Sequence, residues 1–324
     1  MNGADPFARL SAEERALLVP ASLPEKVDPM KAVLTEERFS DPAWVFERKL
    51  DGIRCIAIKG DRGVRLLSRN DLSLNARFPE IAHALETNPA TALVTDGEIV
   101  AFSGGHTSFE RLQQRGERHV SVFYYAFDLL HLAGHDTIRL PLYARRRLLR
   151  GAVAFRDALR LTPSRKRDGE RLYAEACRNG WEGLIAKRAS APYTHGRSRD
   201  WLKFKCTAGQ ELVIGGYTAP RGSRSDLGAL LLGHFDGGRL RYAGKVGTGF
   251  TTATLGDLAA RLAPLRREST PFADAVREPH VTWVEPRLVA QVGFSEWTRD
   301  GRLRHPRFLG LRDDKAAGDV VRES

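Results

Sequence analysis

Hydrophobic and polar positions divide the chain into a short leading arm and two regions with different patterns. In the arm, Ser11 and Glu14 have the spacing of a capping box, which predicts a short helix running through Leu17. Three prolines between positions 20 and 29 then break the pattern. We therefore interpret residues 1–28 as an N-terminal arm appended to the first domain.

The first region, residues 29–208, alternates strand-like runs with turns. Runs rich in Val, Phe and Tyr predict strands within 44–60, 64–70, 92–102 and 120–132, and short strands return at 182–189 and 200–206. Helical patterns occupy 78–85, 143–158 and 171–179, the last of them ended by Gly180. Strands and helices do not alternate regularly, so this region is predicted to be a mixed, mostly antiparallel α+β domain.

The second region, residues 209–324, has short strands at close spacing, separated by Gly and Pro turns. Strands are expected at 211–220, 229–236, 239–247, 280–286 and 288–298, with one helix at 252–265. Five short strands and one intervening helix favour a small β-barrel of the OB type, and a Greek-key sandwich fragment is the alternative.

Length and charge extend this picture. A chain of 324 residues is long enough for two domains with separate cores. Its formal net charge of +11 favours a polyanionic partner such as nucleic acid, although charge alone is compatible with many other basic proteins.

Cysteine use and hydropathy indicate the compartment. Cys55, Cys177 and Cys206 are far apart in the sequence and form no CxxC pair, so we expect neither structural disulfides nor a four-cysteine zinc site. We expect no membrane span and no signal peptide, because no run is long and apolar enough and the first residues contain acids. These features predict a protein of a reducing cytoplasm.

The segment from Glu47 to Arg54 carries the strongest candidate chemistry. Side chains alternate between the two faces of a strand, so Glu47, Lys49 and Asp51 are expected on one face, before a Gly turn. A lysine flanked by two acids on one face is unusual, but a solvated edge strand with alternating charges explains this segment equally well.

Further polar clusters follow along the chain. Asp96 and Glu98 interrupt an apolar run, and a buried acid must be paired or bind a ligand. Glu182 opens another apolar strand, while Lys203 and Lys205 alternate with apolar residues and share one face. Two lysines on one face beside acids are typical of a pocket for phosphates and a divalent metal.

With these clusters in order, the chain resembles the covalent nucleotidyltransferase superfamily, and within it the ATP-dependent DNA ligases. The resemblance rests on ERKLDGIR at 47–54, SRN at 68–70, DGE at 96–98, YAFDLL at 125–130, EGLIAK at 182–187, WLKFK at 201–205 and RDDK at 312–315. The runs at 244–250 and 297–315 are more closely similar to the ligase domain of the bacterial end-joining ligase. The similarity spans about residues 29–315 and implies a nucleotidyltransferase domain followed by an OB-fold domain.

The resemblance implies a role for each motif residue. Lys49 becomes adenylated by ATP, Asp51 serves the later steps near the reacting DNA hydroxyl, and Phe127 stacks on adenine. Mg²⁺ or Mn²⁺ is expected at Glu182 and Glu98. Glu47 is expected to contact the nucleotide, Glu98 the ribose, and Arg69 a phosphate. Three cations are expected to lower the pKa of Lys49: Arg54, Lys203 and Lys205. Asp314 and Lys315 would orient the pyrophosphate, and closure of the second domain would bring them to the site.

The resemblance also implies partners: nicked or broken duplex DNA, a Ku-like end-binding protein, and separate polymerase or nuclease chains. It suggests a nucleoid-associated protein of the cytoplasm. An RNA ligase or mRNA-capping guanylyltransferase uses the same lysine chemistry and is one alternative, and a non-catalytic OB-type nucleic-acid-binding protein is another. A nicotinamide-dependent ligase does not fit, because three cysteines cannot supply its four-cysteine zinc element.

The arginine-rich helix predicted at 143–158 needs a separate interpretation. We expect its four arginines to form a solvated face that could also touch DNA: Arg145, Arg146, Arg147 and Arg150.

Overall fold

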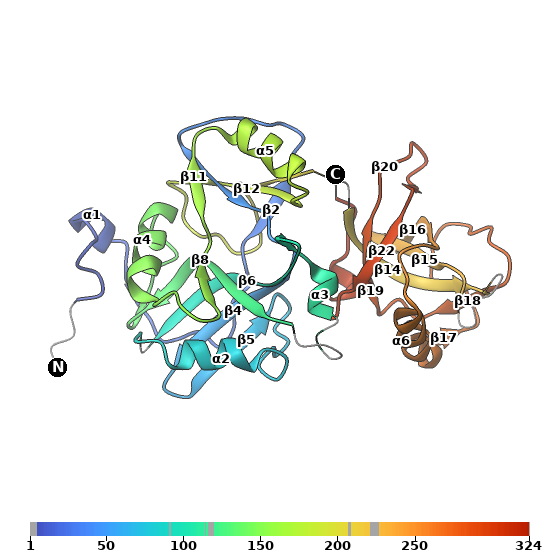
Figure 1. Ribbon diagram of the computed structural model, residues 1–324, viewed down its shortest axis with the longest axis horizontal. Helices are drawn as coiled ribbons and strands as arrows, with labels where there is room; N and C mark the ends of the chain where they lie inside the picture. The colour runs from blue at the N-terminus through green and yellow to red at the C-terminus, as the bar shows by residue number, and fades with distance from the viewer. Residues whose placement is uncertain are drawn as a thin grey trace. The chain divides into compact units, whose positions relative to one another are not determined.

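The computed structural model describes residues 5–90, 92–113, 115, 120–206, 209–220 and 227–323. The chain divides into two compact units, Met1–Cys206 and Thr207–Ser324. The first unit is α+β and the second is a small barrel-like sheet (Figure 1), so the predicted fold class is confirmed.

An eight-stranded sheet forms the larger part of the first unit. Its pairings are antiparallel, except that β10 runs parallel to β8. Along the main path its strands are β1 (Val19–Pro20), β9 (His135–Asp136), β8 (Val122–Leu132), β6 (Leu93–Ser103), β4 (Ile53–Gly60) and β5 (Gly63–Ser68), with β7 (His106–Thr107) on β6 and β10 (Leu159–Leu161) on β8.

Strand β4 shows why this sheet is buried on both faces. Ile53, Cys55 and Ala57 point into one core, which includes residues of α2 (Pro79–Glu86) and α4 (Leu142–Ala152). Ile56 and Ile58 point the other way, into a second core that also holds Phe127 and Trp201. A strand that is apolar on both faces is expected only between two packed layers.

The second layer is a five-stranded sheet. Its order is β11 (Ser164–Lys166), β3 (Trp44–Arg48), β12 (Gly183–Arg188), β13 (Arg197–Lys205) and β2 (Lys31–Leu34). Helix α5 (Gly169–Arg178) packs on one face of it, against apolar side chains such as Phe46 and Phe204. The opposite face carries the candidate site.

The N-terminal segment is packed into the first unit. The capping box of Ser11 and Glu14 is present, but α1 (Ala12–Arg15) ends two residues before the predicted Leu17. Phe7 and Leu10 are buried in the core of the large sheet, and β1 pairs with β9. This segment therefore contributes apolar surface to the unit instead of standing apart from it.

The second unit contains the expected five strands and helix. They are β14 (Gly209–Thr218), β15 (Leu230–Asp236), β16 (Arg239–Val246), α6 (Thr252–Leu262), β18 (Val281–Val284) and β19 (Val289–Gly293). Strand β14 pairs with β15, β18 and β19 along its length, so the sheet bends around a common core. Additional short strands complete the unit: β17 (Arg266–Arg267), β20 (Glu296–Trp297), β21 (Leu303–Arg304) and β22 (Arg307–Leu311).

Two predicted helices are shorter than expected. Helix α4 ends at Ala152 instead of position 158, because the chain must leave the helix to place β10 beside β8. Helix α6 ends at Leu262 and continues as a 3-10 turn, Ala263–Leu265, which contains a proline that cannot donate an α-helical hydrogen bond.

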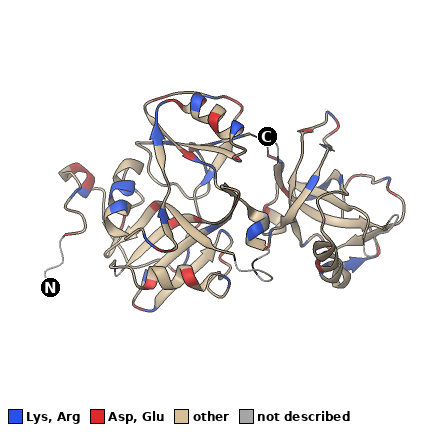
Figure 2. Cartoon of the chain, in the orientation of Figure 1, with Lys and Arg blue, Asp and Glu red and all other residues tan. Residues whose placement is uncertain are grey.

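The prediction that the arginines of α4 form a solvated face is wrong for two of the four. Figure 2 shows where Lys and Arg fall along the chain, α4 included. Arg145 is fully buried and makes a bidentate ion pair with Asp128, at 2.7 and 2.9 Å. Arg146 is buried and bonds to Glu47. The helix therefore turns two charges inward, where acids of β8 and β3 neutralise them.

The prediction that the cysteines stay unpaired is also wrong. Cys177, at the end of α5, forms a disulfide with Cys206, whose Cα atom lies 5.1 Å away. The intervening chain folds back: the amide of Cys206 donates to the carbonyl of Glu182 at 3.0 Å. Residues 29 positions apart thus meet through tertiary folding, which spacing alone does not reveal. Cys55 is a buried free thiol.

Arg145 and Arg150 offer a matched test of the buried ion pair. Arg145→Ala leaves Asp128 buried and unpaired, so it should lower the free energy of unfolding by about 3–5 kcal/mol. Arg150→Ala removes an exposed arginine from the same helix and should change it by less than about 0.5 kcal/mol. Urea unfolding followed by circular dichroism measures both, and equal small effects would contradict the buried pair.

Candidate nucleotidyl-transfer site

The candidate site lies on the face of the five-stranded sheet that is turned away from α5. Side-chain alternation puts Phe46, Leu184 and Phe204 in the core under α5. The register pairs Ile185 with Glu47 on one side and with Lys203 on the other, so these residues form one row across the opposite face. The neighbouring row on that face is Val45, Lys187 and Trp201.

Lys49 follows directly after β3. Its amide donates to the carbonyl of Gly183 at 2.9 Å, and its ammonium group forms an ion pair with Glu182. Burial is the largest influence and lowers the pKa of Lys49, but the carboxylates of Glu182, Asp51 and Glu98 together outweigh it and raise the pKa. In the protein by itself, Lys49 is therefore a protonated, ion-paired lysine.

Asp51 lies in the tight connection between β3 and β4. A Cβ atom on Gly52 would come within 2.2 Å of the carbonyl oxygen of Ile99, so only glycine allows this approach to β6. The amide of Asp51 donates to Thr107 Oγ1 at 3.1 Å, and its carboxylate accepts from the amide of Phe109, at the start of α3 (Phe109–Gln113). The acid is thus held beside Lys49 by two neighbouring segments.

Arg54 does not act as a free cation beside Lys49. Its guanidinium group binds both oxygens of the buried Asp96, at 2.5 Å each, and donates to the carbonyl of Met30 at 3.1 Å. Tyr193 donates to the same carboxylate at 2.7 Å. The expected lowering of the Lys49 pKa by neighbouring cations is therefore absent from the protein alone, since the charge of Arg54 is committed to Asp96.

Glu47 is buried and has two cationic partners. It pairs with Arg146 and, at 2.7 Å, with Lys187. The Lys187 ammonium group also lies 4.1 Å from the ring centroids of Phe127 and Trp201. Burial lowers the pKa of Lys187, against the opposing effect of Glu47. This network connects β3, α4 and β12 at the centre of the first unit.

The other expected nucleotide and phosphate contacts lie in the same unit. Glu98 stands on β6 opposite Arg54 in the register, and its charge contributes to the raised pKa of Lys49. Lys203 and Lys205 are on β13, opposite Ile185 and Gly183. Arg69 follows β5, and its buried Nε has no hydrogen-bond partner among the described residues.

Comparisons with known proteins match this chain over nearly its whole length. The family described as "ATP dependent DNA ligase domain" matches residues 23–205, and "ATP dependent DNA ligase C terminal region" matches residues 223–315. The chain is 40% identical, over 93% of its length, to the multifunctional non-homologous end joining protein LigD of Pseudomonas aeruginosa.

This chain belongs to the ATP-dependent DNA ligases. LigD of Mycobacterium tuberculosis is also 40% identical, over 86% of this chain. In both relatives the match spans 37% of their own length. A solved structure described as mycobacterial DNA ligase D complexed with ATP and MES is 36% identical, has a TM-score of 0.66 and matches 92% of this chain and 98% of its own. Membership places the chain among DNA ligases and not among RNA ligases or guanylyltransferases.

The carboxylates near Lys49 show whether this ligase could bind the expected Mg²⁺ or Mn²⁺. No three His, Cys, Asp or Glu side chains converge as a preformed metal site in the part of the chain that the structure describes. However, Glu182 Oε2 is buried and has no hydrogen-bond partner there. One available carboxylate oxygen suits Mg²⁺, which binds through one or two carboxylates and completes its shell with water and substrate phosphates.

Asp314 and Lys315 of the ligase are engaged inside the second unit. Asp314 is buried and accepts two hydrogen bonds of 2.8 Å from Arg312, while Lys315 pairs with Glu211 at 2.9 Å. Burial raises the pKa of Asp314, but Arg312 and Lys315 outweigh it and lower the pKa. Both residues thus stabilise the end of β22 against β14.

Sequence reasoning missed Arg146 and Lys187, although both leave a signal. Arg146 follows Leu142 by four residues and precedes Leu149 by three, and a charge in such an apolar stripe indicates a buried ion pair. Lys187 closes the EGLIAK run on the same face as Ile185. Only the tertiary structure identifies Glu47 as the common partner.

The Lys49 environment predicts the effect of removing Glu182. Glu182→Gln deletes the strongest influence that raises the pKa of Lys49, so burial should dominate and the pKa should fall. The protonated state of Lys49 would then be lost at lower pH. Carbon-13 NMR of reductively methylated protein, with chelator and without nucleotide, measures this titration. Glu175→Gln, whose acid lies 3.6 Å from Arg165, is the control, and an unchanged pKa in Glu182→Gln would contradict the assignment.

Proposed function

We propose that this chain uses Lys49 to take AMP from ATP and then joins a DNA 5′-phosphate to a 3′-hydroxyl. The observation that carries the proposal is the position of Lys49, directly after β3 and in contact with Glu182, in a chain of the DNA ligase family. The covalent lysine–AMP mechanism is general to that family.

Each of the three steps exchanges one bond at phosphorus. The neutral amine of Lys49 attacks the α-phosphate of ATP, and pyrophosphate leaves. A 5′-phosphate oxygen of DNA then attacks the AMP phosphorus and the bond to Lys49 breaks. Finally the 3′-hydroxyl attacks the 5′-phosphate, and AMP leaves. Positioning and charge stabilisation supply most of the catalysis in such transfers.

Loss of the Lys49 proton is the first requirement in this scheme. In the protein by itself, the carboxylate of Glu182 keeps that proton on Lys49 by pairing with the ammonium group and raising its pKa. We propose that Glu182 and Glu98 bind Mg²⁺ or Mn²⁺, which would offset phosphate charge when bound. Once Glu182 is engaged elsewhere, Lys203 and Lys205 are the cations proposed to favour the neutral amine and to hold the α-phosphate.

The remaining roles concern substrate contact. Glu47 is proposed to fix the nucleotide, Glu98 to bind the ribose hydroxyls and Phe127 to stack on adenine. Lys187 lies 4.1 Å from the Phe127 ring centroid and would have to move when adenine enters. Arg54 would contact the nucleotide through its fixed position beside Phe127, at 4.8 Å. Arg69 is proposed to bind the 5′-phosphate of DNA, and Asp51 to serve the reacting 3′-hydroxyl.

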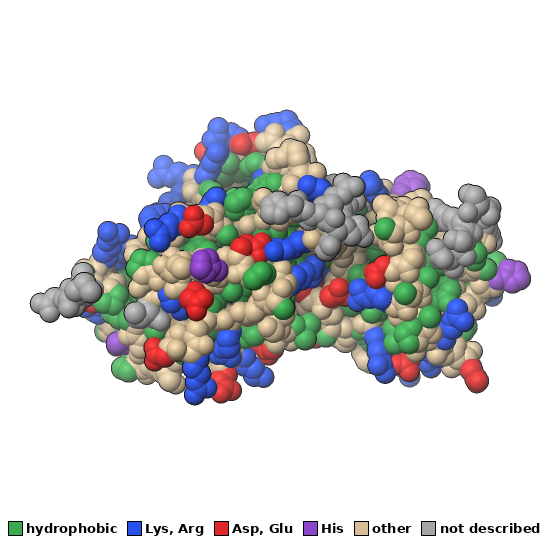
Figure 3. Space-filling view, turned by 60° about the horizontal axis from the view of Figure 1, so that its bottom comes forward, with side chains coloured by type: hydrophobic (Ala, Val, Ile, Leu, Met, Phe, Trp, Pro, Cys, Tyr) green, Lys and Arg blue, Asp and Glu red, His purple; other side chains and the backbone are tan. Residues whose placement is uncertain are grey.

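DNA is the macromolecular substrate of this family. The net charge of +11 supports phosphate contacts, and on the face drawn in Figure 3 the Lys and Arg side chains are interspersed with acids. Because the relatives are named for non-homologous end joining, we propose that the chain acts on broken DNA of the nucleoid, in the cytoplasm. Its proposed partners are a Ku-like protein and separate polymerase or nuclease chains.

No helix in the described parts of the chain is long and apolar enough to cross a membrane.

Lys49→Ala should abolish AMP loading, because it removes the nucleophile of the first proposed step. Mass spectrometry of the protein incubated with ATP and Mg²⁺ should find the adduct in the parent alone. Lys166→Ala, at an exposed position of β11, is the control and should load AMP normally. An adduct that persists in Lys49→Ala would refute the assignment.

A double substitution tests the proposed role of the second unit. Asp314 and Lys315 are proposed to orient the leaving pyrophosphate, which occurs only in the first step. Replacing both with Ala should slow AMP loading by about a hundredfold, as for loss of a transition-state contact. The same variant should still seal a nick that already carries the 5′-adenylate.

The ion pairs of Asp314 and Lys315 make a structural effect the competing explanation. If the variant loads AMP normally, or loses both activities equally while its melting temperature is unchanged, the pyrophosphate role is wrong.

A further inference from the structure

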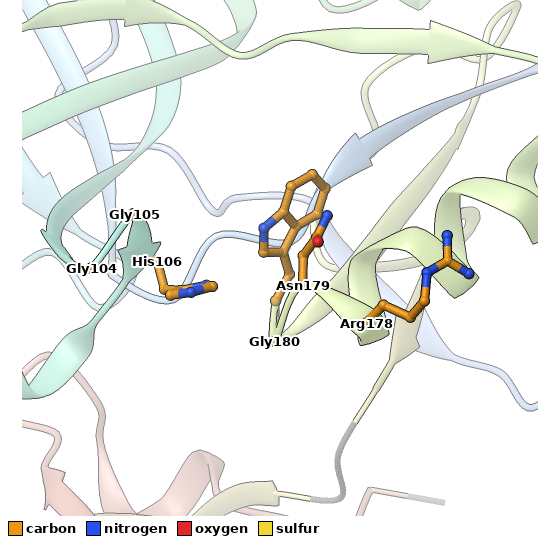
Figure 4. A pocket seen from close by; sticks show the side chains of 7 residues that line it. Gly104, Gly105, His106, Arg178, Asn179 and Gly180 are labelled. Carbon is orange, nitrogen blue, oxygen red and sulfur yellow. The ribbon is translucent and has the colours of Figure 1, made fainter.

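An open pocket of about 600 Å³ lies in the first unit, and none of the roles above uses it. One wall is Gly104–His106, in the turn from β6 into β7, and the other is Arg178–Trp181, between α5 and β12 (Figure 4). In Figure 4 the side chain of His106 points from its wall toward the other, whereas that of Arg178 points away from His106.

Both walls are connected directly to reacting groups. Thr107, next to His106, accepts a hydrogen bond of 3.1 Å from the amide of Asp51. Glu182, next to Trp181, pairs with Lys49. The pocket therefore adjoins Glu182 along the chain and is connected to Asp51 through Thr107, so a ligand in it would lie near two groups proposed to act on DNA and nucleotide.

The pocket has basic character. No carboxylate lines it, and His106 and Arg178 do. Arg48 does not itself line the pocket, but it lies against a residue that does, Trp181, with its guanidinium carbon 4.6 Å from the ring centroid. The Nε and Nη2 atoms of Arg48 are buried and have no hydrogen-bond acceptor among the described residues. Burial lowers the pKa of Arg48, which is the expected cost of a cation without a neutralising partner.

Arg48 is half-buried, and it differs in this respect from other arginines near the site. Arg54, Arg145 and Arg146 each bind the carboxylate of an acid. The two inward nitrogens of Arg48 are shielded from water without such a partner, so an anion that reached them would satisfy them. Arg48 also stands at the variable position between Glu47 and Lys49, where the lysine motif itself requires no particular residue.

The backbone leaves room for such an anion. Gly104, Gly105 and Gly180 adopt positive φ angles of 56°, 84° and 65°. A Cβ atom at Gly104 or Gly105 would have no neighbour within 4 Å, so that side of the turn is open. Main-chain amides that no side chain covers can approach a phosphate closely.

We propose that this pocket binds a backbone phosphate of the DNA within a few nucleotides of the joint, through Arg48 and His106. The proposal rests on the proposed function, because it assigns part of the DNA substrate to the ligase. It assigns a position in the site to His106, outside the family motifs, and to Arg48, at the variable position of the lysine motif. The triphosphate of ATP has the same chemistry and is the competing occupant.

A phosphate scan tests the proposal. Nicked duplexes that already carry the 5′-adenylate are prepared with one phosphate at a time replaced by neutral methylphosphonate, over about five nucleotides on each side of the joint. The KM for sealing is measured with the parent, Arg48→Gln, His106→Gln and Arg62→Gln. Arg62 is an exposed arginine in the turn between β4 and β5 and serves as the charge-matched control.

At one position the methylphosphonate should raise the KM of the parent and of Arg62→Gln by about tenfold, the effect of one charge-assisted hydrogen bond. Arg48→Gln should raise the KM similarly on ordinary DNA and show no further loss at that position. Its slope of log affinity against log salt should be smaller by about 0.9, corresponding to one phosphate contact. Arg48→Lys should restore part of the affinity, which separates charge from folding.

Three outcomes would overturn the proposal. If no methylphosphonate position couples to Arg48 or His106 while the parent seals nicks, the pocket does not bind DNA phosphate. If Arg48→Gln slows AMP loading without DNA as much as it slows sealing, the occupant is the nucleotide triphosphate. A parent protein that neither loads AMP nor seals any nick refutes the proposed function, and the pocket assignment with it.

Discussion

The buried carboxylate of Glu47 is the constraint on which the first unit depends. It lies on β3, two residues before Lys49, and binds Arg146 of α4 and Lys187 of β12. Since α4 packs on the large sheet and β12 belongs to the small one, this acid joins the two layers. An uncompensated charge there would cost several kcal/mol, so β3, α4 and β12 are held in one arrangement. That arrangement sets the position of Lys49, two residues after Glu47.

The same principle recurs around the site. Asp96 with Arg54 and Asp128 with Arg145 are bidentate pairs in which the acid is fully buried. Each joins segments distant in sequence and satisfies groups that an apolar core would leave unpaired. Among the described residues the buried cations are thus paired with acids, whereas the half-buried Arg48, next to Lys49, has two shielded nitrogens without a partner.

In the proposed mechanism, the electrostatics of the site oppose the first chemical step until substrate is bound. Three acids raise the pKa of Lys49 in the protein by itself, and the strongest of them is Glu182. A lysine nucleophile must be neutral, so under the proposal the activation of Lys49 depends on what else Glu182 binds. Such an arrangement would couple the proposed adenylation to the arrival of nucleotide and the proposed metal.

The sequence by itself determined the class of the fold, the barrel strands and the motif order, because side-chain alternation and local turns depend on neighbours along the chain. It located Lys49, Asp51 and Glu182, which the fold brings to one site. It did not determine that Arg145 and Arg146 turn inward, or that Cys177 meets Cys206. It led us to expect the charge of Arg54 beside Lys49, whereas Arg54 pairs with Asp96. In the ion pairs the two partners lie 17 to 99 residues apart in the sequence, and in the disulfide they lie 29 residues apart. Whether a charge is solvated or buried is decided only when the layers pack, because burial is a property of the assembled unit and not of the local sequence.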